Sequence, residues 1–311
     1  MTDVRLELAN EEAADISRGK ESLHDVSAAK WLVMGLDLEE QQCVIFAFLC
    51  AHILTSLACR RVLAWQSSKK VTTLGVAEIQ DKRHALRRRI DAWRDIQQLY
   101  MPCTVQLHQT HLAKISALSA AEEPETMPLF LPSSIPSSLW FTGCASGLID
   151  KECRLCLAQA DDGLNELRRQ LRISATLRDY KKVQVGGRSQ KLNTRTQSLM
   201  SRFHDKTIRA AERYSAAYKA LSSIDPNGEW TTRLKYLDHN KDLRSPRRND
   251  DDESRETRRE LSWIWLVSRE GGPPKEVASA DEINDSKSSQ LPFHIMFCCS
   301  KTQAWDFGSI A

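Results

Sequence analysis

The chain contains little glycine and few aromatic residues, and neither sign of charge prevails. Glycine accounts for 12 of the 311 residues and aromatic residues for 7%. Scarce glycine disfavours a nucleotide-binding α/β enzyme, which needs a glycine-rich phosphate loop. Apolar residues reach only 41% while charged residues reach 27%, so the composition favours long solvated helices over a β-sandwich. The 44 basic residues nearly balance the 41 acidic ones, so any attraction to nucleic acid must come from a local excess of charge.

Motifs of known catalytic sites are also missing. The sequence holds no G-x-S-x-G, no H-E-x-x-H and no set of three acidic residues that each follow a strand pattern. Asp161 and Asp162 are adjacent on a helical pattern, where we expect them to pair with Arg168 or Arg169 rather than bind Mg²⁺. The sequence therefore predicts a protein that is not an enzyme, with no cofactor and no small-molecule substrate.

The nine cysteines do not form a convincing metal site. Cys153 and Cys156 form a C-x-x-C pair without a second pair at suitable spacing, although His108 and His111 could complete four ligands. Because both cysteines lie in an apolar helical stripe, core packing is the favoured interpretation and we predict no metal. The first twenty residues lack the apolar core of a signal peptide, which favours a reducing, nuclear or cytoplasmic location.

One uncharged run stands out near the N-terminus. Residues 43–59 carry no charge over seventeen positions, at the lower limit for crossing a bilayer about 30 Å thick. A membrane span is a minor alternative; a buried helix and an accidental insertion also fit. We interpret the surrounding residues 1–76 as a loose arm, since residues 1–27 are polar and show no sustained periodicity.

Periodicity divides the rest of the chain and predicts a mainly α protein with disordered ends. A stripe at Ile79, Leu86, Trp93 and Tyr100 predicts an amphipathic helix over 77–101, which Pro102 ends. Four prolines between 124 and 136 then favour an extended linker that separates two halves. The predicted parts after this helix are a proline-rich linker 102–146, a helical hairpin 147–225, an acidic and Trp-containing segment 226–286 and a divergent tail 287–311.

The hairpin is the clearest element. Apolar residues follow three- and four-residue steps over 148–180 and again from 192 to 221, with Gly186 and Gly187 between the two runs. Two helices that each have one apolar face should fold back as an antiparallel, coiled-coil-like pair. Trp263 and Trp265, further along, suggest either a short strand or an anchor that packs on this hairpin.

The hairpin is also basic. Residues 151–222 hold sixteen Lys or Arg and seven Asp or Glu, an excess of nine positive charges. Such an excess is typical of contact with a phosphate backbone, although long helices also carry solvated arginine faces. No helix-turn-helix or zinc-finger pattern accompanies it. The candidate nucleic-acid contacts are Arg168, Arg169, Arg172, Arg178, Lys181 and Lys182.

Five segments in one order carry a family resemblance. They are DKRHALRRRIDAWRDIQQLYMPC, MPLFLPSSIPSSL, TGCASGLIDKECRLCLAQADDGLNELRRQLRI, QKLNTRTQSLMSRFHDKTIRAAERYSAAYKALSSIDPNGEW and DDESRETRRELSWIWLVS. Together they resemble the C-terminal part of the cysteine-cluster-associated KDZ transposases of mushroom-type fungi, over roughly residues 78–286. The resemblance implies a role in DNA transposition. It also implies that the RNase H-like catalytic domain of the full protein lies further towards the N-terminus, and we expect this chain to lack it.

Two departures from the family pattern qualify this expectation. The run 43–59 interrupts a segment that is continuous in the family, and residues 287–311 replace an expected further helix. Both resemble a retained intron or a frameshift, so a truncated or mispredicted product without activity is one expectation. The leading expectation is a non-catalytic helical fragment of such a transposase that contributes self-association or non-specific contact with the DNA backbone. The alternative function is an independent coiled-coil scaffold that binds a partner protein through the stripe of Leu164, Leu171, Leu199 and Phe203.

Overall fold

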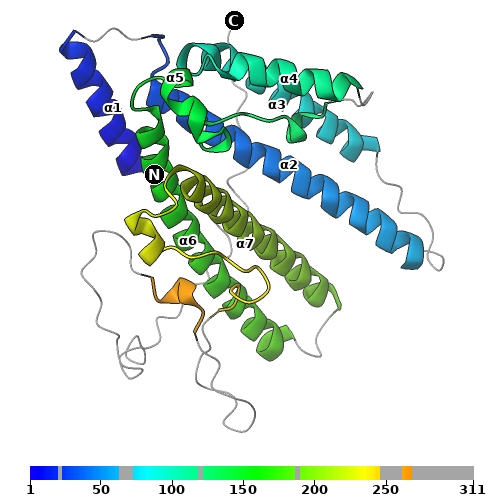
Figure 1. Cartoon of the computed structure of the whole chain (residues 1–311). Helices are drawn as coiled ribbons and strands as arrows, with labels where there is room; N and C mark the ends of the chain where they lie inside the picture. The colour runs from blue at the N-terminus through cyan, green and yellow to red at the C-terminus, as the bar shows by residue number, and fades with distance from the viewer. Residues whose placement is uncertain (20–22, 63–72, 118–121, 186–189, 246–260, 268–311) are drawn as a thin grey trace, which may run out of the picture. The chain divides into compact units, whose positions relative to one another are not determined.

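The computed structural model describes residues 1–19, 23–62, 73–117, 122–185, 190–245 and 261–267. Within these ranges all regular elements are helical and no strand occurs, so the predicted mainly α class is confirmed (Figure 1). Short 3₁₀ turns connect several of the helices. The α-helices are α1 Thr2–Ser17, α2 Ala28–Val62, α3 Thr73–Tyr100, α4 Thr104–Ala117, α5 Trp140–Gly143, α6 Leu148–Tyr180 and α7 Gln190–Ile224.

The predicted hairpin is formed by α6 and α7, which lie side by side (Figure 1). Their antiparallel register follows from two contacts. A Cβ added at Gly163 would lie 3.3 Å from the Cβ of Tyr214, and further along the pair the Lys181 ammonium donates to Gln197 Oε1 at 2.8 Å. A π-helical turn, Lys181–Val185, extends α6. The interior of the pair is made by leucines of α6 and small residues of α7, and includes Leu155, Leu164, Leu167, Leu171, Ala210, Ala211, Ala217 and Leu221.

The amphipathic helix expected over 77–101 is α3, which begins four residues earlier and ends at Tyr100. Its seven-residue stripe is buried, as the periodicity predicted. Trp93 stacks on Trp31 of α2, with ring centroids 4.8 Å apart and planes 7° from parallel. Each indole N–H points to the other residue's backbone: Trp93 Nε1 donates to Trp31 O at 3.0 Å and Trp31 Nε1 to Trp93 O at 3.4 Å. Both side chains are fully buried, so this pair fixes α2 against α3.

The prediction of a loose arm over residues 1–76 was wrong for those residues of the range that the structure describes. Residues 2–17 form α1, and Leu8 of this helix is fully buried in the core. Val4 also packs against the core, and ion pairs join α1 to α6: Arg154 pairs with Glu11 at 2.8 Å and Lys151 with Glu12 at 2.5 Å. Because charge pairs rather than an apolar stripe position this helix, its sequence shows no hydrophobic period.

The interpretation of residues 102–146 as a linker between halves was also wrong. Residues 104–117 form α4, and the prolines then start 3₁₀ turns whose neighbours Met127, Leu129 and Leu131 are buried. Prolines exclude an α-helix here. The segment can nevertheless pack in the core, because side chains of other helices form hydrogen bonds with its backbone carbonyl groups. Gln97 Nε2 donates to Leu129 O at 2.7 Å, and Gln42 Nε2 donates to Met127 O at 2.7 Å. Both predicted halves therefore belong to one compact unit, Met1–Val267.

The tryptophans of the segment 226–286 form a 3₁₀ turn, Trp263–Trp265, and not a strand. Ile264 between them is fully buried, so the interpretation as an anchor on the hairpin is confirmed. No helix among the described residues is both long enough and apolar enough to cross a membrane. The connection at Gly186 and Gly187 and the tail 287–311 lie outside the described residues.

Candidate nucleic-acid interface

The basic charge of the hairpin is concentrated in the half that leads to the connection between the helices. In the described residues 165–185 and 193–209, ten Lys or Arg accompany three Asp or Glu, an excess of seven. In the other half, residues 148–164 and 210–224, four basic residues accompany five acidic ones. This half packs on α1 and α2, where its Lys151 pairs with Glu12 and its Arg213 pairs with Glu40. We call the basic half the distal half of the hairpin.

Of the six predicted contact residues, Arg168 is the one whose guanidinium is held by hydrogen bonds to a distant segment of the chain at two of its nitrogens. Its Nε donates to Ile264 O and its Nη2 to Val267 O, both at 2.5 Å, and Nη1 donates to Asn165 Oδ1 at 3.3 Å. Burial lowers the pKa of this guanidinium, and the nearby charge of Arg172 acts in the same direction. Arg168 therefore faces the tryptophan turn and not solvent, which differs from the expected outward orientation.

The other predicted residues are spread around the helix. Arg169 is exposed and pairs with Glu166 at 2.9 Å, whereas Arg172 lies over the Trp265 ring at 5.2 Å from its centroid. Arg178 donates to Ser245 Oγ at 3.3 Å. Arg169 and Arg178 are nine residues apart, which is two and a half turns, so they point to opposite sides of α6. The six residues do not form a single face, although Lys181 and the exposed Lys182 continue the charge beyond the end of α6.

A more regular basic row lies on α7 and was missed from the sequence. Arg195, Arg202 and Arg209 are exposed and seven residues apart, so they share one face of the helix. Lys206 lies between them and its ammonium is 5.2 Å from the centroid of the Phe203 ring. The seven-residue spacing was visible in the sequence, but the apolar stripe of the same helix has a similar period and concealed it. We call Arg195, Arg202 and Arg209 the α7 arginine row.

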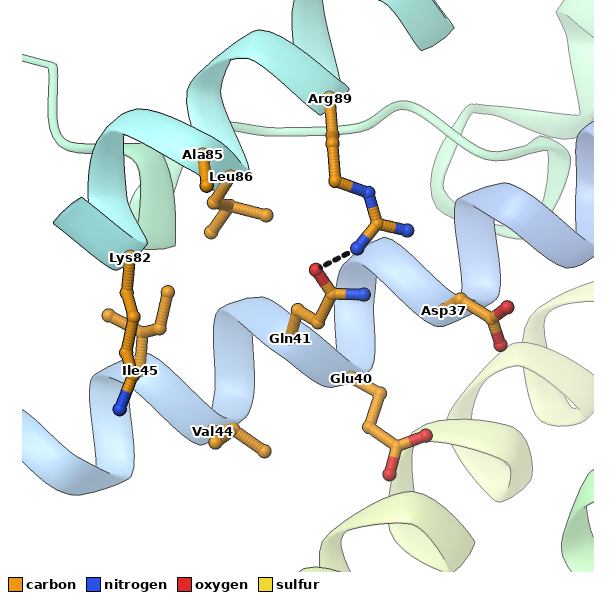
Figure 2. Close-up of a pocket in the computed structure, with 9 residues that line it drawn as sticks. All are labelled: Asp37, Glu40, Gln41, Val44, Ile45, Lys82, Ala85, Leu86 and Arg89. Carbon is orange, nitrogen blue, oxygen red and sulfur yellow. Dashed lines mark hydrogen bonds between the residues drawn. The ribbon is translucent and has the colours of Figure 1, made fainter. Parts of the chain in front are cut away.

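A pocket lies elsewhere, between α2 and α3, with a volume of about 410 Å³ (Figure 2). Its floor is apolar and includes Val44, Ile45 and Leu86. Figure 2 shows Lys82 extending from α3 towards Ile45, while Arg89 donates to Gln41 Oε1 at 2.5 Å. No nucleophile paired with a general base lines this pocket, so its chemistry fits contact with an apolar surface better than a reaction.

Two buried carboxyl groups lie in the core beside the hairpin. Burial raises the pKa of Glu152 to about 8, against the lowering effect of Ser133, whose N–H donates to Oε2 at 2.9 Å. Burial likewise raises the pKa of Glu39 to about 7, opposed by the charge of Lys219. The charge of Glu39 further raises the pKa of Glu152. Glu152 is fully buried and accepts hydrogen bonds from the N–H and hydroxyl of Ser133, so it serves packing rather than the binding of a ligand.

The residues considered for a metal site are not brought together. Within the described ranges, no group of three or more His, Cys, Asp or Glu side chains could hold a metal ion. Cys156 is fully buried and Cys153 packs against the core, as predicted. His108 instead hydrogen-bonds with Gln97 at 3.0 Å, and His111 pairs with Glu122 at 3.0 Å.

The adjacent acids Asp161 and Asp162 also have other partners than expected. Asp161 forms a two-pronged ion pair with Arg233, and Asp162 binds the terminal amino group of Met1 at 3.0 Å. The predicted pairing with Arg168 or Arg169 was therefore wrong, because more distant segments supply the cations. Neither acid is oriented with other carboxylates as a two-metal nuclease site requires.

Known proteins give no further information on this site. No family model, no curated protein and no solved structure matches this chain.

Proposed function

We propose that this chain binds the phosphate backbone of nucleic acid, without reading its sequence, as a non-catalytic helical part of a KDZ-type transposase. The observation that supports this best is the excess of seven positive charges in the distal half of the hairpin. Phosphate contacts supply affinity and position but no base discrimination. The family context rests on the resemblance of the five sequence segments described above.

The α7 arginine row provides the regular part of this surface. Arginines seven residues apart repeat every 10.5 Å along a helix, since each residue adds about 1.5 Å. They can therefore follow a charged backbone over several phosphates. Sequence reading would require Asn, Gln or Arg side chains on a short helix inserted into the major groove, whereas here the basic residues lie along two helices of more than thirty residues.

The test is the affinity of the full chain for two unrelated DNA duplexes across a salt series, measured by fluorescence anisotropy. Replacing Arg195, Arg202 and Arg209 with Gln should lower the affinity and reduce the slope of log affinity against log salt by up to about 2.7, at about 0.9 per phosphate. The triple variant of Lys30, Arg88 and Lys114 to Gln is a matched control, because it removes the same charge from exposed sites outside the hairpin.

Two results would overturn the proposal. A slope near zero for the unsubstituted chain would mean that no phosphates are neutralised. A preference of more than about a hundredfold for one duplex would indicate base reading, since one good bidentate base contact contributes about 1–3 kcal/mol.

The alternative function, a scaffold for protein association, has one observation in its favour and one against it. Leu164 and Leu171 are buried within the hairpin, so this part of the stripe proposed for association is not available, while Leu199 and Phe203 are partly buried. The pocket between α2 and α3 offers an apolar surface instead, and Phe46 nearby on α2 is 52% exposed. Self-association that persists at high salt and is lost in Ile45→Asp would favour this scaffold function.

A further inference from the structure

Residues 262–267, here called the strap, form a short segment laid across α6. The fully buried Ile264 fixes its centre, and the Trp263 ring packs on Tyr214 of α7 with centroids 5.8 Å apart. The carboxylate of Asp242 holds the first two residues of the strap. Ser262 Oγ donates to Asp242 Oδ1 at 2.9 Å, and Trp263 Nε1 donates to Asp242 Oδ2 at 3.2 Å.

The strap occupies the part of Arg168 that would bind a phosphate. The two strap carbonyls, of Ile264 and Val267, accept from Nε and Nη2 of this guanidinium, both at 2.5 Å. These two nitrogens lie on one edge of the planar group. Arginine uses such paired donors to hold the two oxygens of a phosphate or carboxylate. The pair of backbone oxygens therefore stands in the place of two phosphate oxygens.

A second arginine of α6 is engaged by the same strap. The Arg172 guanidinium lies over the Trp265 ring, 5.2 Å from its centroid, and Trp265 Nε1 donates to Arg244 O at 2.9 Å. A guanidinium stacked on an indole gains a cation–π attraction of about 0.5–1 kcal/mol at exposed sites. Two of the arginines on α6 are thus held by one segment of six residues.

We propose that the strap is an internal competitor for nucleic acid, which occupies the paired donors of Arg168 and must leave α6 before this arginine can bind phosphate; the exposed Arg172 only rests on the Trp265 ring. This inference rests on the proposed backbone binding, and it adds regulation to the same surface. The α7 arginine row makes the first contacts, and release of the strap adds Arg168 of α6. Because binding and release are linked, nucleic acid should in turn loosen the strap.

The experiment compares strap variants of the full chain in the same salt series. Asp242→Ala removes the two hydrogen bonds that hold the start of the strap, and Ile264→Ser weakens its buried centre. Both should raise the affinity for DNA and steepen the salt slope by up to about 0.9, for one further phosphate. Leu266→Ser is the matched control, because this side chain belongs to the strap but is 68% exposed.

Hydrogen–deuterium exchange of the peptide containing residues 262–267 supplies an independent readout. In the unsubstituted protein, saturating DNA should accelerate exchange in this peptide. Exchange that slows or stays constant would overturn the proposal, and so would variants that open the strap without a gain in affinity. These outcomes leave the proposed function intact if the α7 row variant still lowers the salt slope; loss of that effect would instead contradict backbone binding itself.

Discussion

Replacing Trp93 with Ala should strongly destabilise the fold. A buried tryptophan removes about 150–250 Å² from water, which at about 25 cal/mol per Å² is about 4–6 kcal/mol as an upper limit. Measured truncations of large aromatic residues in cores cost about 3–5 kcal/mol. Trp31 retains its own acceptor, since that acceptor is the backbone carbonyl of residue 93. We therefore expect a loss of about 4 kcal/mol.

Urea unfolding followed by circular dichroism measures this loss. Trp93→Phe keeps an aromatic ring against Trp31 but lacks the indole N–H, so its cost should be smaller, about 1–2 kcal/mol. Phe141→Ala is the control, because Phe141 is 96% exposed and its truncation should change stability by no more than about 0.5 kcal/mol. A loss below about 1 kcal/mol for Trp93→Ala would refute the conclusion that this stack holds α2 against α3.

Three further predictions concern the hairpin and the acids around it. Because the pKa of Glu152 is raised from 4.5 to about 8, the folded state holds a proton that the unfolded state loses, so the contribution of Glu152 to stability should be greatest below pH 4.5 and fall as the pH rises to about 8. Glu152→Gln should make this fall smaller and leave the part that comes from Glu39, whose pKa is also raised, to about 7; an unchanged slope in urea unfolding would contradict the assignment. Leu171→Asp places a charge in the hairpin and should cost several kcal/mol, whereas the exposed Thr176→Asp on the same helix should not; equal melting curves for the two would contradict the packing of α6 on α7. Finally, we predict no DNA cleavage with Mg²⁺ or Mn²⁺, and nicking that disappears in Asp161→Asn would show this prediction to be wrong.

The sequence predicted those elements that have an apolar face of their own. The stripes of α3, α6 and α7 can be read directly, because each buries leucines and aromatic residues at helical spacing. In contrast, α1 contacts α6 through ion pairs between residues about 140 positions apart, and its own sequence carries no sign of them. A local pattern cannot reveal such contacts, since they depend on where the rest of the chain lies.

The same limit applies to the candidate interface. The basic character of the hairpin was evident from composition, but the orientation of Arg168 was not, because its partners are backbone carbonyls 96 and 99 residues away. Every residue has a carbonyl group, so no residue type signals this contact. The α7 arginine row had a visible signal in its seven-residue spacing, which a search for positive charge by helical position would have found.

The glutamine contacts to the proline-containing segment bear on how this protein can be divided. Gln42 and Gln97 belong to α2 and α3, and their amide groups satisfy carbonyls of the segment that leads into α6. Cutting the chain between residues 102 and 146 would leave these buried amides without acceptors and expose Met127, Leu129 and Leu131. A hairpin fragment produced alone would therefore present a new apolar surface that the whole protein never shows. Aggregation or dimerisation of such a fragment would reflect the cut, and only the intact Met1–Val267 unit can report on how this protein associates.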